Sequence, residues 1–178
     1  MRDIEFSITG DGNTIMVQGG NGPRVLSKTD YHLIRHFLSI IQSRFPKSYN
    51  ALHSLYAESA DWQYLIVVRF IKCNWGNDDE IKDIDEDGNF NFEHVRCPLR
   101  GGLCIYEDVI CHAEEKTDLT NREREVAKLI AAGKSLEEVA STLFVSIKTV
   151  ETHRDNIYTK LSISRQSQLT NWVNGHNI

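Results

Sequence analysis

Apolar and polar residues alternate at the start of the chain, which is the pattern of a strand with one buried face. The alternating apolar positions are Ile4, Phe6, Ile8, Ile15 and Val17. Between the two groups lie residues 10–13, Gly-Asp-Gly-Asn, whose small and polar side chains are typical of a tight turn. The pattern therefore predicts a β-hairpin over residues 4–17.

Two helical patterns follow, and then a continuous apolar run. Ser27 is expected to cap a helix that Pro46 ends, and a second amphipathic helix follows the proline. Their apolar faces are Tyr31, Ile34, Phe37, Leu38 and Ile41 in the first helix and Tyr49, Leu52, Leu55 and Tyr56 in the second. Residues 64–71, Tyr-Leu-Ile-Val-Val-Arg-Phe-Ile, are rich in β-branched side chains and are interpreted as a central strand. These elements predict an α+β domain over residues 1–113.

The last sixty residues carry a different, all-helical pattern. Thr120 with Glu123 and Ser135 with Glu138 have the spacing of helix-capping boxes, Ser146 caps a third helix that runs to about residue 161, and a fourth is expected from Arg165. Inward-facing apolar positions are Val126, Leu129, Ile130, Val139, Ala140, Leu143, Val150, Ile157, Leu161, Leu169, Trp172 and Val173. The short turn over residues 143–147 has the length found in a helix-turn-helix.

Residues 114–178 resemble the LuxR/GerE type of DNA-binding domain, also called the NarL/FixJ type. The matching positions are Leu119, Thr120, Arg122, Glu123, Glu125, Val126, Gly133, Glu138, Ala140, Leu143, Ser146, Thr149, Val150, His153, Asn156, Ile157, Lys160, Leu161 and Arg165. The fourth region of primary sigma factors is similar, but His153 and the Lys160-Leu161 pair favour the LuxR type. The resemblance implies an all-α four-helix LuxR-type domain, which follows the α+β domain that the hydrophobic pattern predicts.

The resemblance also implies which residues touch DNA, with residues 147–161 as a recognition helix in the major groove. Contacts to bases would come from Glu151, Thr152 and Asp155, and contacts to the backbone from Lys148, Thr149, Arg154, Lys160 and Arg165. Relatives often carry lysine or arginine where this chain has Glu151 and Asp155. A carboxylate can accept a hydrogen bond from cytosine but not from guanine. The alternative is that these two acids lie on a solvated helix face.

Charge is distributed unevenly along the chain. The net charge of the whole chain is −5. Residues 119–178 hold eight Lys or Arg and six Asp or Glu, whereas residues 1–118 hold twelve Lys or Arg and nineteen Asp or Glu. This division suits a DNA-binding tail and a body that does not bind DNA. Because the tail is only mildly basic, we expect a homodimer whose two copies add their contacts. Trp172, Leu169 and Val173 are the expected dimer contact, and packing within the monomer is the alternative.

The first domain has no recognised input. The paired acids, central aspartate and late lysine of a phospho-acceptor receiver domain cannot be placed in it, so control by phosphorylation is not expected. The chain shows neither an apolar signal segment nor a membrane-spanning run, and we expect a cytoplasmic protein.

Four cysteines, at Cys73, Cys97, Cys104 and Cys111, are candidate metal ligands. Disulfides are disfavoured in the cytosol, and four thiolates suit zinc or, less favourably, an iron–sulfur cluster. No Cys-x-x-Cys pair is present, so the alternative is a set of buried, inert cysteines. His94 and His112 are reserve ligands. We predict that the four cysteines converge in space.

An acidic stretch, residues 83–88, resembles the start of a calcium-binding EF-hand loop. The twelfth loop position, which should be glutamate, is His94, and Glu93 comes one residue too early. The preferred interpretation is a hairpin turn at Asp87-Gly88.

These features favour a DNA-binding transcriptional regulator, with RNA polymerase as a candidate partner. A second hypothesis is a sigma-like or phage-borne adaptor that acts through protein–protein contacts, which the acidic residues support. A metal-dependent enzyme is the least favoured, because the chain lacks a glycine-rich phosphate loop, a Ser/His/Asp arrangement and an HExxH motif. We therefore do not expect an enzyme.

Overall fold

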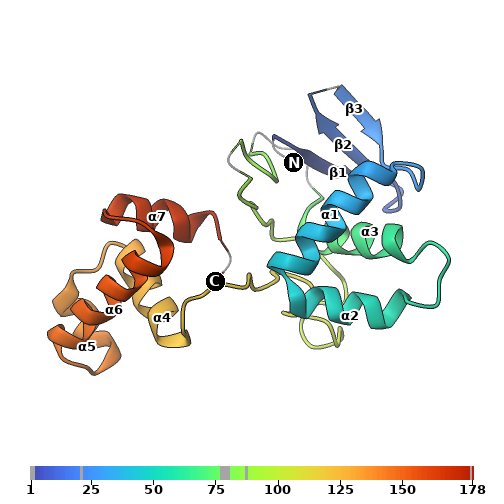
Figure 1. Cartoon of the computed structure of the whole chain (residues 1–178). Coiled ribbons are helices and arrows are strands. Elements are labelled where there is room, and N and C mark those ends of the chain that lie inside the picture. Colours follow the sequence, from blue (N-terminus) through green and yellow to red (C-terminus); the bar gives the residue numbers. More distant parts are fainter. Residues whose placement is uncertain (1–2, 21, 77–80, 87, 177) are drawn as a thin grey trace. The chain divides into compact units, whose positions relative to one another are not determined.

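The computed structural model describes residues 3–20, 22–76, 81–86, 88–176 and 178. They form two compact units, a first unit that extends to Lys116 and a second unit that begins at Thr117 (Figure 1). The sequence suggests an earlier boundary, at residue 113. The residues beyond it are held in the first unit by Arg44, whose guanidinium binds the Glu115 carboxylate (Nε–Oε1 2.5 Å, Nη2–Oε2 3.0 Å). The Arg44 carbonyl also accepts the Lys116 N–H at 2.7 Å.

The first unit begins with a small antiparallel sheet of three strands, β1 (Glu5–Ile8), β2 (Ile15–Gly19) and β3 (Gly22–Val25), in the order β1-β2-β3. The predicted hairpin is confirmed, with Phe6 opposite Val17. Asp11 stabilises its turn, because its carboxylate accepts hydrogen bonds from the Thr9 hydroxyl and two backbone N–H groups. These bonds, that from Thr9 foremost, lower the pKa of Asp11. The third strand, which the pattern does not predict, is a largely exposed edge strand.

Three helices follow, α1 (Tyr31–Arg44), α2 (Pro46–Tyr56) and α3 (Trp62–Asn74). The first two agree with the sequence pattern, although α1 begins four positions after Ser27, whose N–H donates to the Asp30 carboxylate at 2.7 Å. Pro46 ends α1 and also occupies the first turn of α2, where its missing N–H is not needed.

The prediction of a strand at residues 64–71 is wrong, because this segment lies within α3. Buried side chains of α3 recur at helical spacing, at Ile66, Val67, Phe70, Ile71 and Asn74. A short apolar run has no polar alternation that could distinguish a strand from a buried helix. The α+β class of the first unit is nevertheless confirmed by the sheet and the helices.

An aromatic core joins these helices to the sheet and to the chain that follows α3. Trp75 is fully buried, and its ring centroid lies 5.2–6.0 Å from those of five phenylalanines. The five are Phe6, Phe37, Phe70, Phe90 and Phe92. Its indole Nε1–H donates to the Asn91 carbonyl at 2.7 Å. Trp75 thus fixes the segment around residues 90–92, which has no regular structure of its own.

The acidic stretch at 83–88 forms a turn rather than a helix-flanked loop. Ile84 pairs with both Ile4 and Phe90 as isolated β-bridges, and the Gly88 N–H donates to the Asp85 carbonyl at 3.0 Å. Asp87 itself lies outside the described residues. No helix flanks this stretch among the described residues 81–86 and 88–96, in contrast to an EF-hand.

The second unit contains four helices, α4 (Asn121–Ala131), α5 (Leu136–Leu143), α6 (Ile147–Leu161) and α7 (Gln166–Asn174) (Figure 1). Both predicted capping boxes are present, so Thr120 and Ser135 start α4 and α5. One apolar core, which includes Val126, Val139, Val150, Ile157 and Leu169, joins the helices. The predicted all-α unit is confirmed. In the part of the chain that the structure describes, no helix is long and apolar enough to cross a membrane.

Candidate nucleic-acid interface

The turn between α5 and α6 sets the start of the candidate recognition helix. Phe144 has left-handed backbone geometry (φ 55°) and a side chain that is 95% exposed. The next residue, Val145, returns to α5 by donating its N–H to the Ala140 carbonyl at 3.0 Å. The Ser146 hydroxyl then accepts the Thr149 N–H at 3.1 Å and caps α6. These interactions end one helix and begin the next within three residues, 144–146.

Helix α6 has one buried and one exposed face. Val150 and Ile157 are fully buried, where α6 packs against α4 and α5. Lys148, Thr152 and Asp155 are exposed on the opposite side. Spacings of four and three residues place these three side chains on one face of the helix. This face is the one on which the sequence places most of the DNA-contacting residues.

Both acidic residues of this face are paired with cations of the same helix. Glu151 Oε2 lies 3.2 Å from Lys148 Nζ, and Asp155 Oδ1 lies 2.8 Å from Arg154 Nη2. The side chains of Lys148 and Asp155 are 85% and 67% exposed, and such surface pairs contribute only about 0–1 kcal/mol each. Either pair can therefore open at small cost when a phosphate or a base competes for its members.

Lys160 occupies a different environment from the other candidate DNA contacts. Its Nζ lies 2.6 Å from Oε2 of Glu123, the carboxylate that also accepts the Thr120 N–H at the start of α4. The Glu123 side chain is only 4% exposed. Burial raises the pKa of Glu123, but the hydrogen bonds from Lys160 and Thr120 together outweigh it and lower the pKa. Lys160 is thus engaged in joining α6 to α4, a pairing that sequence spacing does not reveal.

The remaining candidate contacts lie at helix starts. The Thr149 hydroxyl is 2.8 Å from that of Ser146, so it takes part in the cap of α6. Arg165 is exposed and precedes the first residue of α7. Arg122, which the sequence includes only as a pattern position, donates to the Leu143 carbonyl at 2.7 Å and so connects α4 to the end of α5.

The second unit also matches known proteins in sequence. Residues 117–173 match the family described as bacterial regulatory proteins, luxR family. They form a LuxR-family domain. The expected resemblance is confirmed for this part of the chain, which supplies all four helices of the second unit.

Three curated relatives are named as transcriptional regulatory proteins or as a response regulator protein. The chain is 32% identical over 97 residues to the probable csgAB operon transcriptional regulatory protein of Salmonella typhimurium. This match covers 46% of this chain and 45% of that protein. It is 50% identical over 50 residues to the transcriptional regulatory protein LiaR of Bacillus subtilis, which covers 28% and 24%. It is 43% identical over 60 residues to the response regulator protein VraR of Staphylococcus aureus, which covers 34% and 29%. The matches thus span less than half the length of each relative.

The last helix of the LuxR-family domain packs mainly within its own unit. Leu169 was expected to contact a second copy, but it is fully buried in the core of its own unit and is not available for a dimer contact. Trp172 and Val173 are partly buried against the same core, and the Trp172 ring stacks on His176 with centroids 4.4 Å apart. Of the three predicted dimer residues, only Trp172 and Val173 keep exposed surface that a partner could contact.

Outside the LuxR-family domain, all four cysteines lie in the first unit as free thiols. Cys73 is in the last turn of α3, and the other three lie in the irregular segment after residue 96. Burial raises the pKa of Cys73 to about 12 and also raises that of Cys111. Interactions among the four are described below.

Three carboxylates of the first unit also gather, which the sequence does not indicate. Glu5, Asp83 and Glu93 each place an oxygen within 4.8 Å of the others. Backbone groups occupy part of this cluster, since the Phe6 N–H donates to Asp83 at 2.5 Å and the Gly76 N–H donates to Glu93 at 2.9 Å. These hydrogen bonds connect the first strand and the end of α3 to the segment around residues 83–93.

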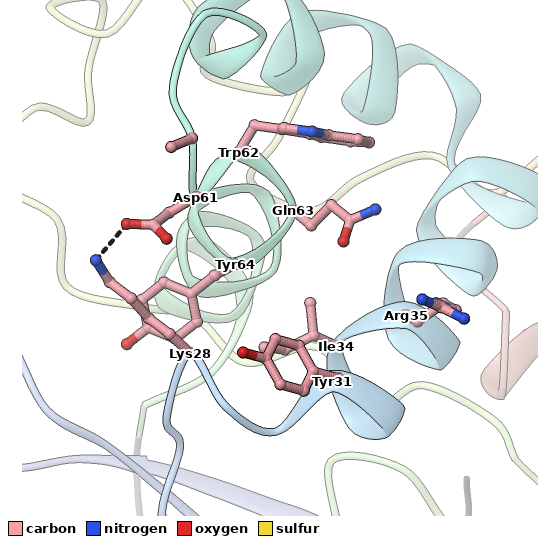
Figure 2. Close-up of a pocket in the computed structure, with 9 residues that line it drawn as sticks. Lys28, Tyr31, Ile34, Arg35, Asp61, Trp62, Gln63 and Tyr64 are labelled. Carbon is pink, nitrogen blue, oxygen red and sulfur yellow. Dashed lines mark hydrogen bonds and ion pairs between the residues drawn. The ribbon is translucent and has the colours of Figure 1, made fainter.

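A small pocket lies between the start of α1 and the start of α3 (Figure 2). Lys28 forms an ion pair with Asp61 at its edge, and Tyr31, Ile34, Trp62 and Tyr64 are among its lining residues. Its volume is about 110 Å³. Sites for drug-sized molecules usually have roughly 300–1,000 Å³, so this pocket does not identify an effector site.

Proposed function

We propose that the protein is a sequence-specific, DNA-binding transcriptional regulator whose helix α6 enters the major groove. The observation that carries this proposal is the exposed face of α6, which a helix-turn-helix presents on a LuxR-family domain. The names of two relatives, both transcriptional regulatory proteins, support it.

Base contacts in this proposal come from Glu151, Thr152 and Asp155. A carboxylate accepts a hydrogen bond from the cytosine amino group, and a threonine can contact several base edges. Asp155 can act in this way once Arg154 turns to a phosphate, because the two share an exposed ion pair. Opening the pair therefore frees one base-reading group and one phosphate-binding group together.

Phosphate contacts come from Lys148, Thr149, Arg154 and Arg165. Residues 119–178 have a net charge of only +2, so a single copy should bind DNA weakly. We propose that two copies bind as a homodimer, because two half-sites double the number of contacts.

A second candidate function is that of a transcription adaptor with little affinity of its own for DNA. The pairing of Lys148 with Glu151 and of Arg154 with Asp155 favours it, since both pairs neutralise cations on the exposed face. The two functions differ in their response to salt. Phosphate contacts release counterions and make binding steeply salt-dependent, whereas an adaptor has no such DNA binding to lose.

Replacing Lys148 with alanine is expected to weaken binding of the full chain to all duplexes about equally. Because one phosphate contact is lost, the slope of log affinity against log salt should become shallower by about one unit. Lys128→Ala is the matched control, since this lysine is exposed on α4 and away from the turn. Fluorescence anisotropy with labelled duplexes at several salt concentrations measures both quantities. A wild-type chain that binds no duplex even at low salt would favour the adaptor.

A further inference from the structure

Two of the four cysteines of the first unit, Cys73 and Cys111, are brought together by hydrogen bonds of Asn74. This residue is fully buried and directly follows Cys73. Its side chain donates to the Ile110 carbonyl at 2.8 Å and accepts the His112 N–H at 2.8 Å. Because these are the two neighbours of Cys111, Asn74 holds Cys111 beside Cys73. The two thiols accordingly interact with each other.

Two turns of similar construction carry the other cysteines toward this pair. The Cys97 carbonyl accepts the Arg100 N–H, and the Cys104 carbonyl accepts the Glu107 N–H, each at 3.1 Å. The Glu107 carboxylate then accepts N–H groups of both glycines at 101–102, at 2.9–3.0 Å, and so ties the two turns together. Arg100 Nη1 lies 3.0 Å from Nε2 of His112, so the first turn reaches the residue next to Cys111. In agreement, Cys97 contributes to the raised pKa of both Cys73 and Cys111, and Cys104 contributes to that of Cys111.

Two arginines supply positive charge to the same region. Arg69, one helical turn before Cys73 on α3, interacts with Cys73, Cys97 and Cys104. Arg100 interacts with Cys111. Arg69 Nε and Arg100 Nε and Nη2 are buried and have no hydrogen-bond acceptor among the residues that the structure describes. A buried charged donor without a partner lowers the stability of the fold, so this region favours an anionic group beside the arginines.

We propose that Cys73, Cys97, Cys104 and Cys111 hold a metal centre through four thiolates, either one zinc ion or an iron–sulfur cluster. Four thiolates and Zn²⁺ together carry a charge of −2, which the two guanidinium groups offset. None of these arginine N–H groups is hydrogen-bonded to a sulfur in the described structure, so the arginines support the site through their charge. Inert buried cysteines would account for the burial of Cys111 but not for two cations whose charges act on these thiols.

The histidines are not ligands in this proposal. Arg100 Nη1 lies 3.0 Å from Nε2 of His112 and 3.4 Å from Nδ1 of His94, so each histidine has one ring nitrogen engaged by the arginine. Among the described residues, no three of the cysteine sulfurs lie within 4.8 Å of one another. Tetrahedral zinc, with Zn–S of about 2.3 Å, requires sulfurs about 3.8 Å apart, so they would have to move closer. A [4Fe–4S] cluster binds each thiolate through a different iron and suits a wider spacing.

Elemental analysis of the full chain, purified without oxygen and without chelators, tests the proposal independently of DNA binding. We expect about one zinc per chain, or iron with equimolar acid-labile sulfide and visible absorption. Cys104→Ser should lose the metal, whereas the control Ile105→Ser should keep it, because the adjacent Ile105 side chain is 84% exposed.

A second measurement uses the wild-type chain, so its result does not depend on whether a cysteine variant folds. Removal of metal from the wild-type chain should lower the unfolding temperature of the first unit and leave that of the LuxR-family domain unchanged, since the latter has its own core. Metal-free wild-type protein whose unfolding temperature does not rise after incubation with zinc, or after iron and sulfide reconstitution, would overturn the proposal. Full retention of metal by Cys104→Ser would overturn the four-thiolate assignment.

Discussion

Replacing Trp75 with alanine is expected to destabilise the first unit by about 3–5 kcal/mol, the range measured for removal of a large buried aromatic side chain. Trp75 is fully buried and its ring contacts aromatic side chains from β1, α1 and α3. The substitution also leaves the Asn91 carbonyl without its indole donor. Since domains are stable by only about 5–15 kcal/mol, a large fraction of the first unit should unfold under mild denaturant.

Urea unfolding followed by circular dichroism measures this effect, because the signal does not depend on the tryptophan that is removed. Trp62→Ala is the matched control, since Trp62 is only partly buried at the start of α3. The transition of the LuxR-family domain should be unaffected, because its apolar core is separate. Equal losses of stability in the two tryptophan variants would show that Trp75 does not organise the core in this way.

Replacing Lys160 with alanine is expected to destabilise the LuxR-family domain by about 1.5–3 kcal/mol, the usual range for a hydrogen bond to a charged group. The change removes the cation that faces Glu123, whose side chain is 4% exposed. In a domain of this size such a loss lowers the unfolding temperature by roughly 4–8 °C per kcal/mol. Lys128→Ala, an exposed substitution on α4, should have little effect.

The effect of Lys160 should also depend on pH. The pKa of Glu123 is lower in the folded state than its ordinary value, so its ion pair contributes stability above a pH of about 4.3, the unfolded glutamate value. This contribution is lost as the pH falls through the lowered folded pKa. The difference between wild type and Lys160→Ala should therefore be largest near neutrality and shrink in acid. If the variant keeps wild-type stability at pH 7 but loses one unit of salt slope in DNA binding, Lys160 is a phosphate contact instead.

The parts of the fold that could be predicted are those specified by neighbouring residues. Helix starts are predicted by the capping boxes, because each one joins residues only three positions apart, Thr120 with Glu123 and Ser135 with Glu138. The hairpin turn is similarly local, since Asp11 satisfies donors two to three residues away. The LuxR-family domain was recognisable because such signals recur along it at fixed spacing.

The parts that could not be predicted depend on contacts between distant residues. Residues 64–71 form a helix rather than a strand because the aromatic core covers them, and nothing within the run itself reveals that core. Lys160 and Glu123 are 37 positions apart, so their ion pair is visible only in the fold. The edge strand Gly22–Val25 contains a proline and an exposed arginine and lacks an alternating apolar pattern. Its pairing with β2 could therefore not be predicted from its own residues.

Selection of bound sequences from a random duplex pool by the full-length chain tests the central claim, recognition of DNA through α6. We expect one enriched sequence pattern with two half-sites whose centres are separated by roughly 10 base pairs or a multiple of that spacing. The pattern should change in a Thr152→Ala variant, because this side chain is exposed on the face directed at bases. Recovery of unenriched random sequences by a folded wild-type chain would contradict the account.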